Sequence, residues 1–278
     1  MKITVLVNDL ADSGLTASHG LSFWIETAAG CVLFDTGQSP AFDYNVQQLA
    51  TPLEAARAIV LSHGHYDHAN GLPCALSRNS SAPIYLHPDA RRTRYSIRDR
   101  APKSIGMSPV AKFALNAAKG RRVWTKGPEE VLEGVHATGL IPRRTPFEDT
   151  GGPFFLDIEG REPDSIDDDQ ALWIETSSGV VVVLGCAHAG VVNTLDYICA
   201  LSGRSNIHAV IGGMHLASAS SCRLNDTVKA FQRCSVQQVI PCHCTGEIAT
   251  QYLQDRLHGR VLECTAGRAF KFPDYPKY

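Results

Sequence analysis

The chain has 278 residues, of which 44% are hydrophobic, 19% charged and 8% aromatic, and its formal net charge at pH 7 is −2. This composition supplies enough apolar material for a large core, so it excludes a disordered or collagen-like chain. The near-neutral charge gives no global reason to expect a polyanionic partner such as a nucleic acid.

The N-terminal residues and the cysteines indicate the cellular compartment of the protein. The first residues contain a single base, Lys2, and an apolar run that ends near Asp9, which is too short for a signal peptide. The nine cysteines lack the spacing of a disulfide framework. We therefore expect reduced thiols, a cytoplasmic location and no membrane association.

Two segments share the pattern Trp-Ile-Glu-Thr-x-x-Gly, one within residues 23–37 and one within residues 172–185. Each predicts a strand, a tight turn closed by Gly30 or Gly179, and a second apolar strand. Coincidence between two hairpins is the alternative, but each copy is followed by a histidine-bearing loop. We expect two similar halves within one domain that spans residues 1–278.

The other predicted elements alternate between strands and helices. The sequence predicts a helix at 51–57, with Pro52 in its first turn, and further helices at 191–201, 225–234 and 247–257. Asn225 is the expected cap of the third of these helices. Strands are predicted at 58–62, 82–87, 208–212, 236–240 and 260–272. This alternation after opening hairpins indicates a mixed-sheet α/β architecture.

Charge is unevenly distributed in the middle of the chain. Residues 91–122 contain ten Lys or Arg and one acid, whereas residues 148–169 contain nine acids and one base. Glycines and prolines in the basic segment suit a long insertion, at about residues 88–122, better than a core element. The insertion is either a mobile lid whose arginines recognise an anion or a structural segment that docks on the acidic stretch.

The strongest chemical signal is the motif His63-x-His65-x-Asp67-His68, directly after an apolar strand. Three imidazoles and a carboxylate within six residues are not explained by core packing, because each would need a buried hydrogen-bond partner. Neutral imidazole and carboxylate suit zinc, and also iron or manganese. Two ions about 3.5–4 Å apart can share a hydroxide that is nucleophilic near neutral pH. A surface histidine cluster is the alternative.

This motif, the upstream Phe34-Asp35-Thr36-Gly37 and the two-half layout resemble the metallo-β-lactamase fold superfamily. Further segments resemble the branch named for dihydropterin ribofuranosylaminobenzene phosphate synthase: residues 85–90, 168–172, 185–190, 211–216 and 241–246. The resemblance covers residues 1 to about 272. It implies a four-layer αβ/βα sandwich with the metal site at one edge of two facing sheets.

The sequence departs from the ligand pattern of typical hydrolases in this superfamily. Their Pro-Gly-His-Thr-like turn has its counterpart at residues 138–143, which contain no histidine, and His136 does not fit the register. Their bridging aspartate would fall near Cys186, which is either a thiolate ligand or a buried thiol. We expect His188 to complete the shell, because it follows the repeated hairpin, and His243 resembles the superfamily's last ligand.

The expected ligands form two sets. His63, His65 and His188 would hold one divalent ion, and Asp67, His68 and His243 would hold the other, with zinc as the expected metal and iron or manganese as alternatives. Asp67 is also the expected catalytic residue, since it can manage a proton.

Several other residues are candidate contacts. Those that could touch metal or substrate are His87, His215, Cys186, Arg143, Asp168 and Asp169. The arginines expected to form an anion-binding lid are Arg91, Arg92 and Arg94. The histidines that match no motif and are expected to be ordinary are His19, His208 and His258.

These residues favour a metal-dependent hydrolase that acts on a small anionic molecule, such as one that bears phosphate. One alternative is an iron-dependent redox enzyme of the same fold, similar to sulfur dioxygenases. A second alternative is a binding module without turnover, against which the retained Asp67 argues. Cleavage of β-lactams does not follow from fold resemblance, because function depends on the site.

Overall fold

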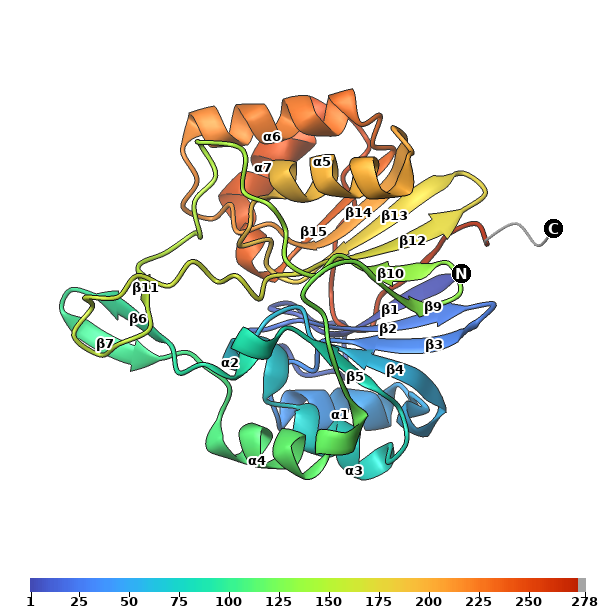
Figure 1. Ribbon diagram of the computed structural model, residues 1–278. Coiled ribbons are helices and arrows are strands. Elements are labelled where there is room, and N and C mark those ends of the chain that lie inside the picture. The colour runs from blue at the N-terminus through green and yellow to red at the C-terminus, as the bar shows by residue number, and fades with distance from the viewer. Residues whose placement is uncertain (275–278) are drawn as a thin grey trace.

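The computed structural model describes residues 1–274. Two sheets face each other at the centre of the molecule and helices cover their outer faces, so the chain forms a four-layer αβ/βα sandwich, as predicted (Figure 1). The first sheet has the order β16-β1-β2-β3-β4-β5-β8 and the second the order β15-β14-β13-β12-β10-β9. A third sheet, β11-β6-β7, protrudes from one side of the sandwich (Figure 1).

The strands of the first sheet are β1 Lys2–Val7, β2 Ser22–Thr27, β3 Gly30–Phe34, β4 Ala56–Val60, β5 Ile84–Leu86, β8 Arg122–Trp124 and β16 Ala269–Lys271. Those of the second are β9 Glu129–Leu132, β10 Val135–Ala137, β12 Leu172–Thr176, β13 Gly179–Leu184, β14 Ile207–Gly213 and β15 Gln238–Cys242. The protruding sheet consists of β6 Tyr95–Arg98, β7 Ala101–Ser104 and β11 Phe154–Phe155.

The helices divide between the two outer faces (Figure 1). The first sheet is covered by α1 Ala41–Gln48, α3 Leu72–Arg78 and α4 Pro109–Ala117, and the second by α5 Val191–Ser202, α6 Ser221–Arg233 and α7 Glu247–Leu257. The short helix α2, Tyr66–Ala69, carries part of the histidine motif. Within residues 1–274, no helix is long and apolar enough to cross a membrane.

Strand alternation explains why both faces of each sheet are covered. In β13, Val181 and Val183 pack between the sheets, whereas Val180 and Val182 pack under the helices of the second sheet. Side chains of successive strand residues point to opposite faces, so a strand that is apolar at every position needs cover on both sides. The two predicted hairpins are confirmed as β2–β3 and β12–β13.

Three predicted elements differ from the structure. The expected helix at 51–57 is a 3-10 turn at Leu53–Ala55, because Ala56 already pairs with Cys31 of β3. The helix expected at 225–234 begins one turn earlier, at Ser221, and its cap is Ser220, whose hydroxyl accepts the Arg223 N–H. The strand expected at 260–272 is ordered as a strand only at 269–271, where it pairs with β1.

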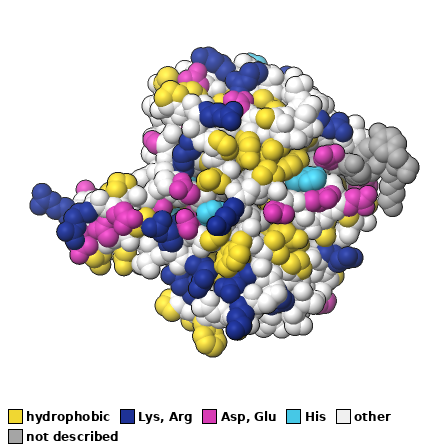
Figure 2. Space-filling model, in the orientation of Figure 1, with side chains coloured by type: hydrophobic (Ala, Val, Ile, Leu, Met, Phe, Trp, Pro, Cys, Tyr) yellow, Lys and Arg dark blue, Asp and Glu magenta, His cyan; other side chains and the backbone are white. Residues whose placement is uncertain are grey.

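The basic insertion is anchored on the acidic stretch. Arg94 is fully buried, with its Nε atom 2.7 Å from Asp164 Oδ2 and its Nη1 atom 2.7 Å from Asp168 Oδ2. The exposed Arg92 pairs with Glu162, and basic and acidic side chains alternate over the protrusion (Figure 2). The expectation that Arg94 is a free anion-binding lid residue is wrong, because two buried carboxylates already occupy its guanidinium.

Arg94 also links the insertion to the histidine motif. Asp168 Oδ2 accepts the backbone N–H of Gly64 at 2.7 Å, between His63 and His65. A Cβ atom at Gly64 would lie 1.9 Å from the Ala90 carbonyl oxygen, so only glycine allows this contact. The start of the insertion is therefore fixed against the loop that carries the motif.

Replacement of Arg94 should destabilise the protein strongly. Arg94→Ala leaves Asp164 and Asp168 buried without their partner, and loss of one member of a buried ion pair costs about 3–5 kcal/mol. Arg92→Ala, on the exposed surface, should change the free energy of unfolding by no more than about 0.5 kcal/mol. Urea unfolding at pH 7 measures both, and equal stability of the two variants would contradict the anchoring role.

Candidate metal centre

The predicted ligands meet where parallel strands end. The motif follows β4, His188 follows β13, and His243 follows β15, at the edge where the carboxyl ends of the two sheets come together. Four non-glycine residues that follow these and neighbouring strands within three positions have a left-handed backbone: Asp35, Ala187, His215 and His243. Strained backbone of this kind concentrates at functional sites, where it aims side chains that a regular strand could not.

The first cluster consists of His63, His65 and His188, all buried. Their ring centroids lie 4.5 to 4.9 Å apart, and His63 Nε2 is 3.0 Å from His65 Nδ1. Two nitrogens bound to one tetrahedral zinc ion lie about 3.3 Å apart. Burial lowers the pKa of His65 to about 3 and holds the pKa values of His63 and His188 well below normal. The three imidazoles are therefore neutral, which is the form that binds metal.

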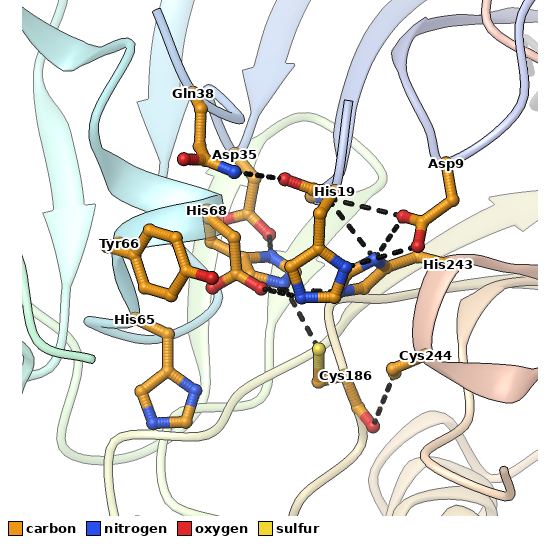
Figure 3. A network of polar contacts seen from close by, with 12 residues as sticks. Asp9, His19, Asp35, Gln38, His65, Tyr66, His68, Cys186, His243 and Cys244 are labelled. Carbon is orange, nitrogen blue, oxygen red and sulfur yellow. Dashed lines mark hydrogen bonds and ion pairs between the residues drawn. The ribbon is translucent and has the colours of Figure 1, made fainter. Parts of the chain in front are cut away.

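The second cluster surrounds the Asp67 carboxylate. His243 Nε2 lies 3.4 Å from Asp67 Oδ2, and His68 Nε2 lies 3.1 Å from Cys186 Sγ (Figure 3). The ring of His68 is 4.3 Å from that of His63, so the two clusters are adjacent. Burial alone would raise the pKa of Asp67, but hydrogen bonds from His19 and His243 hold it well below its usual value. Asp67 is a carboxylate in this setting.

Outer hydrogen bonds fix the orientation of four of these histidines. Each Nδ1 atom contacts an oxygen outside the clusters: His63 contacts Ser62 Oγ at 2.9 Å, His68 contacts Asp35 Oδ2 at 2.7 Å, His188 contacts the Thr150 carbonyl at 2.7 Å, and His243 contacts Asp9 Oδ1 at 2.6 Å. The Nε2 atoms remain for the interior, and that of His188 is buried without a partner. This division of the two nitrogens is typical of metal-ligating histidines.

The orphaned nitrogen of His188 and this hydrogen-bond pattern show that the residues fit divalent metal ions. The donor set of imidazoles, carboxylate and one adjacent sulfur suits zinc, iron or manganese. Three of the candidate groups of ligand atoms lying within 4.8 Å of one another are His63 with His65 and His188, His63 with His68 and Cys186, and Cys186 with His188 and His215. Burial raises the pKa of Cys186, so the residue is a thiol in the protein without metal.

Of the other residues predicted to contact metal or substrate, some lie beside the clusters and others lie away from them. His215 stacks near His188, with ring centroids 4.5 Å apart, and so borders the first cluster. His87 Nδ1 accepts the Asp89 N–H and caps a short 3-10 turn. Arg91 is exposed and donates to Asn116.

Three further candidates support the backbone instead of facing a substrate. Arg143 Nη1 donates to the His188 carbonyl at 2.6 Å, and its other terminal nitrogen contacts the Ser165 carbonyl. Asp169 Oδ2 accepts the Ala189 N–H at 2.8 Å, and burial raises the pKa of Asp169 to about 7. Asp168 is occupied by Arg94 and the Gly64 N–H. These contacts correct the expectation that Arg143 and Asp168 are free for substrate.

The protruding sheet covers the first cluster with an aromatic ring. The Phe154 centroid lies 5.4 Å from that of His65, 5.5 Å from that of His188 and 6.1 Å from that of His215. Phe154 pairs with Ser96 of β6, and its carbonyl accepts the Asp164 N–H. The insertion therefore acts as a fixed roof over the histidines, and the aromatic residue of the roof was not predicted from the sequence.

Two more residues of the site were missed by sequence reasoning. His19, expected to be ordinary, lies 3.1 Å from Asp67 Oδ2 through its Nε2 atom, and hydrogen bonding to Asp67 raises its pKa to about 9. Asp35 is fully buried and holds both Ser62 and His68. The Phe-Asp-Thr-Gly segment pointed to Asp35, but no spacing pattern connects His19 to the motif.

Comparison with known proteins identifies the family. The sequence profile described as the metallo-beta-lactamase superfamily matches residues 15–195. The chain belongs to this superfamily. As a metallo-beta-lactamase superfamily protein, it has the fold and the histidine motif that the family resemblance implied.

Individual relatives cover almost the whole chain. A 7,8-dihydropterin-6-methyl-4-(beta-D-ribofuranosyl)-aminobenzene-5′-phosphate synthase from Methanocaldococcus jannaschii is 29% identical over 98% of this chain and 97% of its own length. An uncharacterised protein from the same organism is 30% identical over 88% of this chain and 90% of its own. The crystal structure of Tm1679, described as a metal-dependent hydrolase of the beta-lactamase superfamily, superposes with a TM-score of 0.81 at 29% identity, covering 99% of this chain and 100% of that one.

Asp35→Asn should weaken metal binding. Asp35 Oδ1 accepts the backbone N–H of Ser62, and Oδ2 contacts Ser62 Oγ and His68 Nδ1. An amide has a single acceptor oxygen, so when that oxygen faces the fixed Ser62 N–H its NH2 group faces His68, which must turn or carry its proton on Nε2, the nitrogen that faces the cluster. Loss of such an outer partner lowers metal affinity by about 10–100-fold. Competition with a chromophoric zinc chelator measures this, with Asp89→Asn on the insertion surface as control. Unchanged zinc affinity in folded Asp35→Asn would contradict the role of Asp35.

Proposed function

We propose that the protein is a metal-dependent hydrolase that acts on a small molecule bearing a phosphate group. The observation that carries the proposal is the arrangement of the nitrogens in four histidines, in which Nδ1 atoms contact outer oxygens and Nε2 atoms face a shared interior: His63, His68, His188 and His243. A histidine cluster kept for packing or solubility has no need of this arrangement.

His63, His65 and His188 would hold one ion, and Asp67, His68 and His243 the other, with Cys186 as an adjacent sulfur donor. Divalent ions bound there would make water nucleophilic near neutral pH and polarise an oxygen of the substrate. Zinc is the expected metal, since neutral imidazole, carboxylate and thiol donors all suit it.

The chain itself contributes orientation and proton handling. Asp67 would handle the proton of an attacking water, and the contacts of its Oδ2 atom with His19 Nε2 and His243 Nε2 fix the orientation of its carboxylate. Phe154 covers the first cluster and limits the access of bulk water on that side.

A cavity of about 660 Å³ beside His243 suggests what the rest of the substrate is like. Its wall includes the carboxylates of Asp9, Glu247 and Glu263 and, among the described residues, no lysine or arginine. A phosphate would therefore be held at the metal positions, and this cavity would take a neutral polar group that hydrogen-bonds to amide and hydroxyl side chains. The name of the M. jannaschii relative, which includes a ribofuranosyl 5′-phosphate, supports a substrate of this kind.

The word synthase in that name favours a second candidate function, in which a phosphate-bearing substrate is joined to another molecule. The hydrolase description of Tm1679, at the same identity, favours hydrolysis. The two functions require the same metal positions and differ in what attacks the substrate.

The test begins with metal-free protein reconstituted with zinc. We expect two equivalents of zinc and hydrolysis of bis(p-nitrophenyl) phosphate or p-nitrophenyl esters. His188→Ala should lower metal content about as strongly as His243→Ala. Asp67→Asn should reduce the hydrolysis rate by at least about 100-fold, because it removes both a ligand and a proton acceptor.

His258→Ala, exposed after α7, is the matched control and should match wild type. Protein that binds no metal would contradict the proposal outright. Zinc-loaded protein that hydrolyses none of these esters would favour the synthase, and bound iron with oxygen uptake on a thiol would favour the redox alternative.

A further inference from the structure

His19 lies outside the histidine motif, on the loop between β1 and β2. The backbone brings it to Asp67: the Leu21 N–H donates to the Asp67 carbonyl at 3.2 Å. Gly20 has a φ of +138°, and a Cβ atom there would lie 2.2 Å from the same carbonyl oxygen. The Gln38 side chain donates to the His19 carbonyl (Figure 3). The position of His19 beside the second cluster is therefore fixed by its own loop.

The side chains form a closed ring of polar contacts. His19 Nε2 lies 3.1 Å from Asp67 Oδ2, and His19 Nδ1 lies 3.1 Å from Asp9 Oδ2. The other oxygen of Asp9 lies 2.6 Å from His243 Nδ1, and His243 Nε2 lies 3.4 Å from the same Asp67 oxygen. One carboxylate thus orients two imidazoles whose Nε2 atoms converge on Asp67 Oδ2.

His19 therefore has the same arrangement as the predicted ligands, with Nδ1 held by an outer oxygen and Nε2 directed inward. A carboxylate behind an imidazole is a common support for a metal ligand, because it fixes the ring and raises the basicity of the other nitrogen. The ring of His19 packs at 4.5 Å from that of His243, so both present their edges to the same space (Figure 3).

We propose that His19 is a ligand of the second metal position, together with Asp67, His68 and His243. This inference rests on the proposed function, because it requires that position to hold a metal ion. It adds a ligand from the N-terminal loop to a set in which a thiol, Cys186, stands where the superfamily's bridging aspartate is expected.

The competing role for His19 is a hydrogen-bonded counter-ion of Asp67. The His19 side chain is 56% exposed and that of Asp67 is 9% exposed, so water reaches this pair from the His19 side and screens it. The partial exposure also sets His19 apart from the buried His68 and His243, since it lies at the mouth of the site. A ligand in that position is accessible to molecules in solution.

The experiment compares wild type with His19→Ala and His19→Gln by cobalt titration of the metal-free proteins. Cobalt(II) replaces zinc at such sites, and its visible absorption reports the ligands around each ion. Glutamine keeps a donor for the Asp67 hydrogen bond and is a poor metal ligand, so it separates the two roles. Asp9→Asn tests the carboxylate that contacts the Nδ1 atoms of both His19 and His243. His258→Ala is the control.

We expect both His19 variants to bind the first cobalt equivalent like wild type and the second at least about 10-fold more weakly. The spectrum of the second equivalent should change in both variants. In His19→Ala, added imidazole should restore it by taking the vacated ligand position. Asp9→Asn should weaken the second equivalent without changing its spectrum, because both imidazoles remain.

Wild-type affinity and spectrum in His19→Ala would overturn the assignment. The assignment would also be overturned if His19→Gln bound the second cobalt equivalent with wild-type affinity and spectrum, or if His19→Ala kept a wild-type spectrum that did not respond to imidazole. Either result would make His19 a hydrogen-bond partner of Asp67. Failure of the wild-type protein to bind any cobalt would instead overturn the proposed function, together with this inference. Binding of a single equivalent by wild type would overturn the second metal position and leave the first intact.

Discussion

The burial of many imidazoles in one small space is the constraint on which this structure depends. His63, His68 and His188 have no exposed surface, and the outer contact of each Nδ1 atom requires a defined tautomer. Buried polar atoms without partners are costly, so each ring needs a partner on its outer nitrogen and another on its inner one. Serine, aspartate and backbone oxygens supply the outer partners, and a bound metal ion would satisfy the inner ones.

The sandwich provides these partners because of its topology. Parallel strands in each half end at the same edge, so loops from residues 35, 63, 188 and 243 meet there although they are far apart in the sequence. Three of those loops turn through left-handed non-glycine residues, at Asp35, Ala187 and His243. The apolar packing between and outside the sheets must compensate for this strain, which is of order 1–3 kcal/mol per residue.

The roles of the basic insertion and the acidic stretch become visible only in the folded molecule. Arg92 and Arg94 pair with carboxylates of the acidic stretch, and the fully buried Arg94 joins both segments to the loop of the motif through Asp168. The result is a fixed roof that presents Phe154 to the histidines. Substrate selection on this side of the site would therefore depend on an aromatic ring, whereas the opposite side offers His19, Asp9 and the polar cavity beside His243.

The sequence by itself determined the features that depend on local patterns. The repeated hairpins, the alternating apolar strands of the core and the His-x-His-x-Asp-His motif each follow from residues that are neighbours in the chain, and they were sufficient to indicate the fold and its superfamily. The helices at 191–202 and 247–257 also matched, because their own residues favour that structure. The expected helix at 51–57 did not, because pairing of Ala56 with Cys31 decided that segment.

Only the tertiary structure decided the roles of residues whose partners are distant in the sequence. Arg94 and Arg143 looked like free cations, but carboxylates and carbonyls more than twenty residues away occupy them. His19 looked ordinary because its partners, Asp67 and His243, come from loops separated by 48 and 224 residues. The charge and hydrogen-bonding capacity of a side chain can be read from the sequence. Which distant residues pair with that side chain is determined by how the sheets and their loops pack.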